Sequence, residues 1–451
     1  MLSSQLREFY CTSPMREGVL CWYPFKQGSI VLDQSGGVLS ELLSSKPVYP
    51  TQDSDRLVDY IIALDPEDFS EKTLSELRGK LSSHGRLLIA YENPFALRYW
   101  AGASAPNTGA PYDTLLGNGD SPAPSKAELE NRLMQAGFNG QKWYYLSPDH
   151  WFTGEVHSDN YMPNELMNQR LIPYIADDKN LQFDERQLHR EVIRGGAFSF
   201  MCGAYLVEAR VCGDDEPCIV NYAAVTSFRD TVNRFATIVS NDGTVRKTPL
   251  HEDAISSVKK THENHEDLAK LGVSVVKTRL ENDSLIMSFV DLPTIWDYWA
   301  LKLLVGHFDE NEMISHFDRM REDIYKASKN GRCYWEMVPA NCFYDEKTDE
   351  MTYFDQEHYW EDASPDVAVA RALWALRYSE VFAADNRSEK LLETLKRRYG
   401  IADKWDELSY LAHNKTLEML FFKGESQLRQ ETENALKTIA SNTCVRDSSV
   451  T

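Results

Sequence analysis

Residues 333–360, CYWEMVPANCFYDEKTDEMTYFDQEHYW, hold the spacing that decides how the second half of the chain is interpreted. Glu336 is followed five residues later by Asn341, and Asp355 comes fourteen residues after Asn341. Carboxylate and amide oxygens are ligands for hard cations such as Mg²⁺, and a carboxylate can also take a proton from a hydroxyl group. The stretch therefore predicts a metal site for phosphate chemistry. The alternative is a polar loop followed by a strand that ends in a turn.

The segments around this stretch follow a definite order. A hairpin turn is predicted at Asn241-Asp242-Gly243, between two strand-like runs. After it come a polar helix over 252–272, strands over 273–280 and 284–290, and mostly helical sequence beyond residue 293. A hairpin, a helix, more strands and then a helical half with an acid-x4-Asn loop are the element order of a protein-kinase-like fold. We therefore predict an α+β, protein-kinase-like C-terminal domain.

Each part of a kinase-like site has a candidate in this order. Lys247, after the hairpin, would hold the nucleotide phosphates, and Glu263, on the next helix, would orient that lysine. Glu336 occupies the place of the catalytic acid. Asn341 and Asp355 occupy the places of the two residues that bind metal ions. Mg-ATP is thus the cofactor predicted for this domain.

Two features count against full activity of such a site. The acid at position 336 is Glu rather than Asp, and a carboxylate displaced by about an ångström can cost about a hundredfold in rate. The segment SFRDTVNRFAT (227–237) contains no G-x-G-x-x-G motif, so a phosphate-covering loop must work through side chains such as Arg229. The domain is therefore expected to be either an active phosphotransferase or an inactive scaffold.

The first 150 residues alternate strand-like and helix-like segments. Buried strands are predicted at 59–65 and 86–93, and a further strand at 142–148. A helix is predicted to start at Ser70 and to stop at Gly85, and a second helix over 125–137 has Ser125 as its N-cap. This alternation predicts a parallel, doubly wound α/β sheet, which is Rossmann-like.

A glycine-containing turn follows the first predicted strand of this sheet. In GSIVLDQSGGVLSELL (28–43), Asp33, Gly36 and Gly37 are the candidates for a loop whose backbone approaches S-adenosylmethionine. Only about twenty residues separate this segment from the next strand, too few for the missing β-α unit with its ribose-binding acid. We expect a truncated domain, and a sheet that binds no cofactor is the alternative.

Residues 88–113, LIAYENPFALRYWAGASAPNTGAPYD, carry a more specific pattern. A strand ends in Glu92 and Asn93, and a Phe-x-Leu-x-Tyr-Trp-Ala-Gly-Ala segment and an Asn-Thr-Gly loop follow. This stretch resembles bacterial methyltransferase-like proteins from surface-polysaccharide gene clusters. The likeness continues in HSDNYMP (157–163), VRKTPLHEDA (245–254), MVPANCFY (337–344) and FDQEHYW (354–360), and covers about residues 20–380. The architecture is similar to that of bifunctional methyltransferase–kinases that cap O-antigen chains.

The resemblance implies a domain plan and a function in cell-surface polysaccharide biosynthesis. The plan is a truncated class I methyltransferase-like domain (1–150), a connector (151–195), a kinase-like domain (196–385, with lobes 196–292 and 293–385) and a helical tail with a disordered end (386–451). The kinase-like domain would phosphorylate a glycan or glycolipid hydroxyl, and Glu92 and Asn93, at a strand's carboxyl end, would contact the acceptor. Alternatives are an inactive scaffold for glycosyltransferase or export partners, and an S-adenosylmethionine-dependent methyltransferase.

Charge and cysteine content limit the remaining classes of function. A formal net charge of −21 argues against a bare nucleic-acid-binding surface, because phosphate contacts need clustered Lys and Arg. The eight cysteines form no CxxC pair, which favours reduced thiols in the cytosol. No apolar run reaches the ~20 residues needed to span a bilayer. We expect a cytoplasmic protein without a transmembrane segment, able at most to associate peripherally with the inner face of the membrane.

Overall fold

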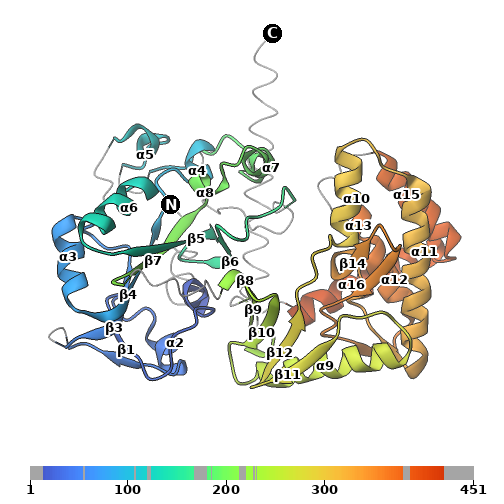
Figure 1. Cartoon of the computed structure of the whole chain (residues 1–451). Coiled ribbons are helices and arrows are strands. Elements are labelled where there is room, and N and C mark those ends of the chain that lie inside the picture. The colour runs from blue at the N-terminus through green and yellow to red at the C-terminus, as the bar shows by residue number, and fades with distance from the viewer. Residues whose placement is uncertain are drawn as a thin grey trace, which may run out of the picture. The chain divides into compact units, whose positions relative to one another are not determined.

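The computed structural model describes residues 14–53, 56–105, 108–118, 123–166, 180–183, 185–212, 220–226, 229, 231–378 and 386–420. These residues form two compact units. Unit 1 contains the described residues up to 226 together with 236–242, and unit 2 contains those within 229–235 and 243–420. Figure 1 labels the elements of both units. Each unit is described separately below.

The first strands of unit 1 form a parallel sheet, as predicted. Each strand pairs in parallel with its neighbours, in the order β2-β1-β3-β4. The apolar runs of β3 and β4 are almost wholly buried, as expected for strands covered on both faces. The bounds are β1 (Ile30–Asp33), β2 (Tyr49–Thr51), β3 (Val58–Leu64) and β4 (Leu81–Glu92).

The second half of this sheet is antiparallel and differs from the predicted domain plan. β7 (Ala204–Arg210) lies between β4 and β5 (Gly140–Pro148) and is antiparallel to both. The order then continues with β6 (Thr153–Ser158), β8 (Val220–Val225) and β9 (Phe235–Ser240). The predicted connector 151–195 therefore contains a sheet strand, and the first unit extends past the predicted boundary at 196. Strand periodicity indicates a strand but not the sheet that it joins.

Helices α3 (Glu71–Gly79) and α6 (Lys126–Gln135) pack side by side on one face of this sheet (Figure 1). The predicted cap of α6 is present: the Ser125 side chain accepts from the Glu128 backbone, and the Glu128 side chain accepts in return. The predicted stop of α3 at Gly85 is wrong, because the helix ends at Gly79 and Gly85 lies inside β4. Unit 1 also contains α2 (Ser40–Ser45), α4 (Leu97–Trp100), α5 (Asp113–Leu116), α7 (Arg186–Arg194), α8 (Phe198–Met201) and the 3₁₀ helix η1 (Pro14–Val19).

Unit 2 begins with a small antiparallel sheet and a long helix. Three strands pair in the order β11-β12-β10, and α9 packs on them through Ala254 and Val258, which contact Phe235 and Leu285. The predicted turn at Asn241–Gly243 connects β9 to β10, and Gly243 has a φ of 77°. The bounds are β10 (Thr244–Pro249), α9 (Ala254–Lys270), β11 (Thr278–Glu281), β12 (Ser284–Ser288) and η3 (Thr231–Asn233).

The rest of unit 2 is mainly helical, as predicted. α10 (Ile295–Leu304) and α11 (Glu310–Ala327) begin at the side-chain N-caps Thr294 and Asp309. Two short antiparallel pairs follow, β14 (Cys342–Asp345) with β15 (Glu350–Tyr353), and β13 (Arg332–Cys333) with β16 (Trp360–Glu361). The remaining elements are η4 (Ser328–Asn330), η5 (Pro339–Asn341), α12 (Pro365–Leu373), α13 (Ala375–Tyr378), α15 (Asn386–Arg398), η6 (Ala402–Lys404) and α16 (Trp405–Leu420).

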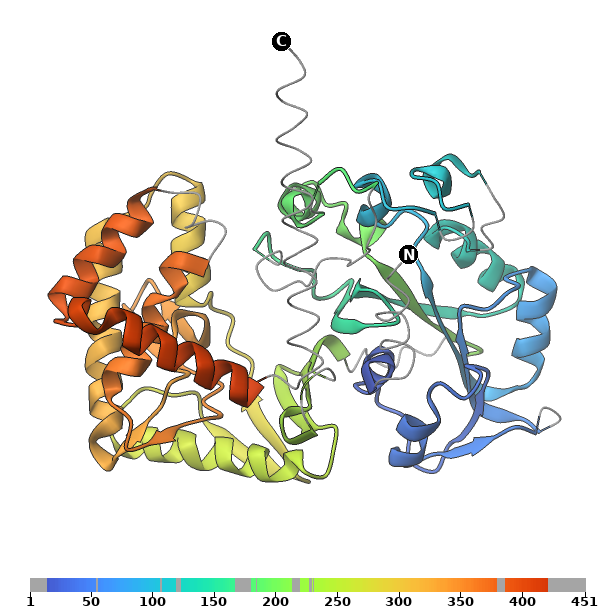
Figure 2. The same ribbon diagram turned by 180° about the vertical axis from the view of Figure 1, so that it is seen from behind.

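The described part of the predicted tail belongs to unit 2. α16, the dark red helix of Figure 2, packs against α12, and its first residue, Trp405, is buried. Residues 386–420 are thus part of the core of this unit rather than a separate segment. The end of the tail, 421–451, lies outside the described residues. Within the described residues, no helix combines the length and the apolar character that crossing a membrane requires.

Candidate functional site

Lys247 is the centre of the candidate site in unit 2. It lies on β10 with its side chain buried, and its ammonium group donates to Asp355 Oδ1 at 2.6 Å and to Glu357 Oε1. The ammonium also lies 4.7 Å from the centre of the Phe235 ring. A buried lysine requires a paired carboxylate, because an isolated charge is costly to desolvate. The structure thus joins two of the residues that the sequence had selected, Lys247 and Asp355.

The β14–β15 hairpin brings Asn341 and Asp355 to the same end of a small sheet. Asn341 precedes β14 and Asp355 follows β15, and the register pairs Cys342 with Tyr353. The Phe354 backbone N–H donates to the Asn341 carbonyl at 3.0 Å, so Asp355 lies one residue beyond this contact. Asp355 has a φ of 56°, a left-handed conformation that Asp tolerates better than most residues. Local strand pairing therefore brings together the two residues that were predicted to bind a metal ion.

Glu336 is buried beneath the loop that carries Asp355. Its Oε2 accepts hydrogen bonds from the backbone N–H groups of Glu357 at 2.8 Å and His358 at 2.9 Å. Burial, together with the nearby Asp355 charge, raises the pKa of Glu336 to about 7, although the Arg371 guanidinium acts in the opposite direction. The geometry makes Glu336 a support of the 355–358 loop.

Glu263 does not contact Lys247, contrary to the prediction. It lies on the exposed face of α9, whereas the next two residues, Asn264 and His265, are buried. Asn264 Nδ2 donates to the carbonyls of Gln356 at 2.9 Å and Glu357 at 3.2 Å. The partner of the lysine is instead Glu357, which the sequence analysis did not select. Position 264 lies on the buried face of α9. The helical spacing of the apolar positions was the sequence signal that could have shown that residue 264, rather than 263, faces the core.

A second cation also approaches Glu357. Arg229, which the sequence suggested as a substitute for a glycine-rich loop, places its guanidinium 3.9 Å from Glu357 Oε2. Burial raises the pKa of Asp355, but the adjacent Lys247 ammonium outweighs it, so that the net shift of this pKa is downward. Asp355 is consequently a carboxylate at neutral pH, and its side chain is 40% exposed. One partly accessible carboxylate thus lies beside the buried Lys247 ammonium, with the partly buried Arg229 guanidinium nearby.

The donor set at Asn341 and Asp355 suits a magnesium ion. Asn341 Nδ2 donates to the Glu336 carbonyl at 3.2 Å, so its amide oxygen is the group left to face a cation. An amide oxygen and a carboxylate are the hard ligands that Mg²⁺ prefers, alongside water and phosphate oxygens. Lys247 supplies the positive charge that phosphates require. These residues fit Mg-ATP chemically.

The glycine loop of unit 1 gives weaker support to the predicted S-adenosylmethionine site. Asp33 is buried, and its Oδ1 accepts from the Ser35 backbone N–H at 2.8 Å. Gly36 and Gly37 have φ angles of 69° and 84°. A Cβ added at Gly36 would meet no atom within 4 Å. Backbone conformation alone accounts for both glycines, and Asp33 is satisfied by its own turn.

Glu92 belongs to a charge network at the carboxyl ends of β3 and β4 that is built on two buried cations. Arg98 is fully buried, and it pairs with Glu92 and, at 2.6 Å, with Asp149. His150 bridges onward: its Nδ1 lies 2.9 Å from Asp149 Oδ1 and its Nε2 lies 2.7 Å from Asp65 Oδ2. Two cations thus hold three carboxylates at the edge where α/β sheets bind ligands. The network, which we name the Arg98 network, was not foreseen beyond Glu92.

Asn93, the other residue predicted to contact the glycan acceptor, makes structural hydrogen bonds with its whole side chain. Its side chain is completely buried, and Nδ2 donates to the carbonyls of Phe200 at 2.8 Å and Cys202 at 2.7 Å. Its Oδ1 accepts from the Phe95 backbone N–H at 2.9 Å. Because these bonds fasten the end of β4 to α8, the predicted contact with an acceptor is not supported for Asn93.

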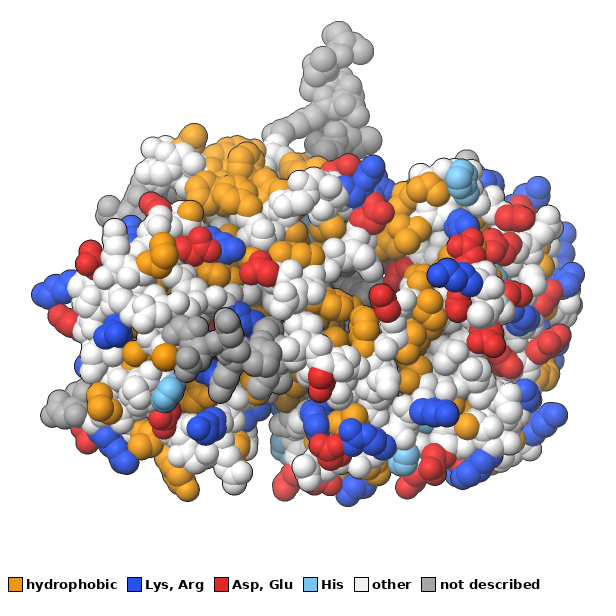
Figure 3. Space-filling view, viewed as in Figure 1, with side chains coloured by type: hydrophobic (Ala, Val, Ile, Leu, Met, Phe, Trp, Pro, Cys, Tyr) orange, Lys and Arg blue, Asp and Glu red, His pale blue; other side chains and the backbone are white. Residues whose placement is uncertain are grey.

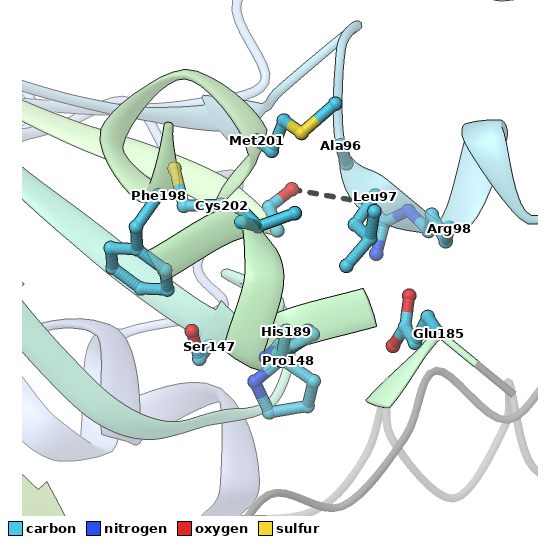
Figure 4. A pocket seen from close by; sticks show the side chains of 12 residues that line it. Ala96, Leu97, Arg98, Ser147, Pro148, Glu185, His189, Phe198, Met201 and Cys202 are labelled. Atoms are coloured by element: carbon cyan, nitrogen blue, oxygen red, sulfur yellow. Dashed lines mark hydrogen bonds between the residues drawn. The ribbon is translucent and has the colours of Figure 1, made fainter. Parts of the chain in front are cut away.

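A pocket lies beside the Arg98 network. Figure 4 shows Arg98, Glu185 and His189 at its wall, with Ser147 and Pro148 from the end of β5. The Arg98 guanidinium also donates to the Gly203 carbonyl at 3.4 Å. The other lining residues are Ala96, Leu97, Val192, Phe198, Met201, Cys202 and Gly203. The pocket combines an apolar lining with a few polar groups, as binding sites for small molecules do.

Hydrophobic side chains also gather on the surface of unit 1 over α4 and α8 (Figure 3). Trp100 and Phe200 are both exposed there, and the Phe95 ring stacks on Phe200 at 4.9 Å between centroids. Exposed aromatic residues of this kind are suited to an apolar partner or a lipid surface.

The Arg98 network predicts a specific dependence of stability on pH. Burial lowers the pKa of His150, but Asp65 and Asp149 outweigh it and raise this pKa from 6.5 to about 10. A raised folded-state pKa gives stability that is complete below pH 6.5 and is lost as the pH rises toward 10. Urea denaturation from pH 6 to pH 10 should show a loss of the order of a few kcal/mol.

Two variants test this assignment. His150→Asn should flatten the pH dependence, whereas the control His84→Asn, at an exposed position of β4, should leave it unchanged. An equally steep loss in His150→Asn and in the wild type would show that another group is responsible.

No protein-family model matches the chain, and no curated protein sequence matches it either.

Proposed function

We propose that unit 2 is a protein-kinase-like module that binds Mg-ATP and transfers phosphate to a hydroxyl group of a surface glycan or glycolipid. The observation that carries the proposal is the ion pair between Lys247 and Asp355, which are 108 residues apart in sequence and 2.6 Å apart in space. A lysine on a strand and an aspartate after a hairpin are the two residues that kinase-like sites place against the phosphates and the metal.

The order of elements around this pair supports the same proposal. Lys247 lies on β10, and α9 follows it and packs on the same small sheet. After β11 and β12 come two long helices, a loop, and the β14–β15 hairpin that ends near Asp355. This succession is the one from which the kinase-like fold was predicted.

In the proposed reaction the chain mainly positions and neutralises charge. Lys247 would bind the phosphates, and Asn341 and Asp355 would hold Mg²⁺, which neutralises phosphate charge when bound. Glu336 is buried and accepts two backbone N–H bonds, so it positions the Asp355 loop. This positioning role replaces the predicted role of catalytic base. Phosphoryl transfer needs little covalent help from the protein, so positioning can supply most of the rate enhancement.

Unit 1 enters the proposal as a truncated class I methyltransferase-like domain that contributes to acceptor binding. Its support is the strand order, in which the reversed strand β7 lies between β4 and β5, two strands that run parallel to each other. The surface-glycan acceptor rests on the resemblance of 88–113 and of the C-terminal motifs. The exposed aromatic residues over α4 and α8 suit the lipid part of a glycolipid or peripheral contact with a membrane.

The test is thermal unfolding of the full chain with and without ATP and Mg²⁺. At about a hundred times its Kd, a ligand adds about 2.7 kcal/mol to the free energy of unfolding, which corresponds to a shift of a few degrees. The shift should require Mg²⁺ and should disappear in Asp355→Asn. Glu266→Gln, on the exposed face of α9, is the matched control and should retain it. Absence of any shift in the wild type would remove the proposal.

A second candidate function is an inactive scaffold for glycosyltransferase or export partners. It is favoured by one observation: Lys247 is already paired with both Asp355 and Glu357. This candidate expects a partner that co-purifies in stoichiometric amount and remains bound to Asp355→Asn. A magnesium-dependent shift with ATP would count against it. Because Asp33 is satisfied within its own turn, methyl transfer is not part of either candidate.

A further inference from the structure

A second cluster of ligating side chains lies next to the Lys247–Asp355 pair. Glu336, Glu357 and His358 each offer one ligand atom, and these atoms lie within 4.8 Å of one another. All three side chains are buried. We name this group the Glu336 cluster. It shares no residue with the Asn341–Asp355 site to which the proposed function assigns magnesium.

The His358 imidazole is the part of the cluster that points to a ligand. Its side chain is 9% exposed, and its Nε2 has no hydrogen-bond partner among the described residues. Nε2 lies 3.5 Å from Glu357 Oε2, and the ring stacks on Trp335 with centroids 5.9 Å apart. A buried polar nitrogen without a hydrogen bond is unusual in a folded protein and is costly when nothing binds it.

The contacts around the cluster leave a carboxylate oxygen facing the imidazole. Lys247 donates to Glu357 Oε1, and Arg229 remains 3.9 Å from Glu357 Oε2. The Glu357 oxygen that faces the imidazole is therefore available to a cation. An imidazole nitrogen without a hydrogen bond and a facing carboxylate oxygen are both groups that bind metal ions.

We infer that Glu336, Glu357 and His358 form a binding site for one divalent transition-metal ion, for which Zn²⁺ is the reference ion. One imidazole nitrogen and two carboxylate oxygens are a donor set that zinc accepts, with water in the fourth position. Two ligand atoms of a tetrahedral zinc ion are about 3.4 Å apart, close to the separation between His358 Nε2 and Glu357 Oε2. The ligand atoms of the cluster lie within 4.8 Å of one another, so the widest pair must approach by up to roughly 1.4 Å to complete the site.

The ion would connect two segments of unit 2. Glu336 precedes η5, whereas Glu357 and His358 follow Asp355, so a metal bound by all three fixes the loop that carries Asp355. The inference goes beyond the proposed function, because it requires neither nucleotide nor acceptor. It gives the Glu336 cluster a structural role that supplements the backbone bonds to Glu336 Oε2.

The experiment is calorimetric titration of the full chain with Zn²⁺ alone, after removal of metal by a chelator and with no nucleotide present. We expect one Zn²⁺ per chain, and we expect His358→Phe to weaken the affinity by at least about tenfold. Phenylalanine keeps the ring that stacks on Trp335 and removes the nitrogen. His251→Phe is the matched control, because His251 also lies beside a carboxylate, 3.2 Å from Asp253, but is exposed.

Three outcomes decide the question. Binding of less than half an equivalent to the wild type overturns the inference without reference to any variant. Equal affinity in the wild type and in His358→Phe also overturns it. Should His358→Phe not fold, the Cu²⁺-loaded wild type gives a second measurement, and an electron paramagnetic resonance spectrum without hyperfine coupling to a nitrogen nucleus overturns the inference. Asp355→Asn should retain Zn²⁺, so a lost nucleotide site and a lost zinc site are distinguishable.

Discussion

Replacing Lys247 with methionine is expected to lower the free energy of unfolding by about 3–5 kcal/mol. Methionine fills similar space but removes the ammonium group that pairs with Asp355 and Glu357. Glu357 is buried, so it would be left as a poorly compensated charge with only Arg229 at 3.9 Å. Removal of one partner of a buried ion pair is more destabilising than replacement of both. Urea denaturation of the full chain measures the loss.

The double variant Lys247→Met with Glu357→Gln separates stability from nucleotide binding. Neutral glutamine removes the unpaired charge, so most of the lost stability should return. The thermal shift with Mg-ATP should stay absent, because the phosphates have lost their lysine. Recovery of the shift in the double variant would show that Lys247 does not bind phosphate. Unchanged stability in the single variant would mean that the ion pair is not formed in solution.

Replacing Arg98 with methionine is expected to have a similarly large effect, about 3–5 kcal/mol, on unit 1. Arg98 is fully buried and binds Glu92 and Asp149 at once. Without the guanidinium, Asp149 keeps, within the described part of the chain, only His150 as a cationic partner. Unfolding by urea, followed by circular dichroism, measures the change.

A graded series of substitutions checks the cause of this loss. Arg98→Lys keeps the positive charge but lacks the planar fork that reaches two carboxylates, so it should lie between wild type and Arg98→Met. The control Lys72→Met removes a cation whose partner Glu76 is exposed, and it should change stability by no more than about 1 kcal/mol. Equal losses in Arg98→Lys and Arg98→Met would contradict a charge-based role.

The elements of the fold could be predicted well where local signals were strong. The Ser125 cap, the buried runs of β3 and β4 and the turn at Gly243 are all present. Gly85 misled because a glycine after an apolar helical pattern looks like a helix stop, whereas here it occupies a strand. The position of β7 could not be predicted, because pairing between distant strands leaves no local pattern in either of them.

The candidate site was predicted in part. The spacing assigned Lys247 and Asp355 to one site, and in the structure they form an ion pair, with Asn341 at the start of the adjacent hairpin. Glu263 was chosen by chemistry and distance along the chain, but the rotation of α9 directs Asn264 inward instead. Glu357 was not selected, because it lies in the loop two residues after Asp355. A loop has no periodic pattern from which the direction of its side chains could be predicted. Side-chain direction in loops depends on tertiary contacts that sequence spacing does not specify.

The position of β7 determines when the sheet edges of β4 and β5 are exposed, both during synthesis of the chain and in truncated forms of it. β4 pairs with β7 over Arg86–Glu92 and β5 pairs with β7 over Gly140–Leu146, and the two strands do not pair with each other. Until residues 204–210 have left the ribosome, both strands present open edges, which are prone to pair with other chains. A fragment that stops at residue 150 or 195 would carry the same two edges permanently. The shortest piece of the first unit that can be expected to remain monomeric therefore extends beyond residue 210.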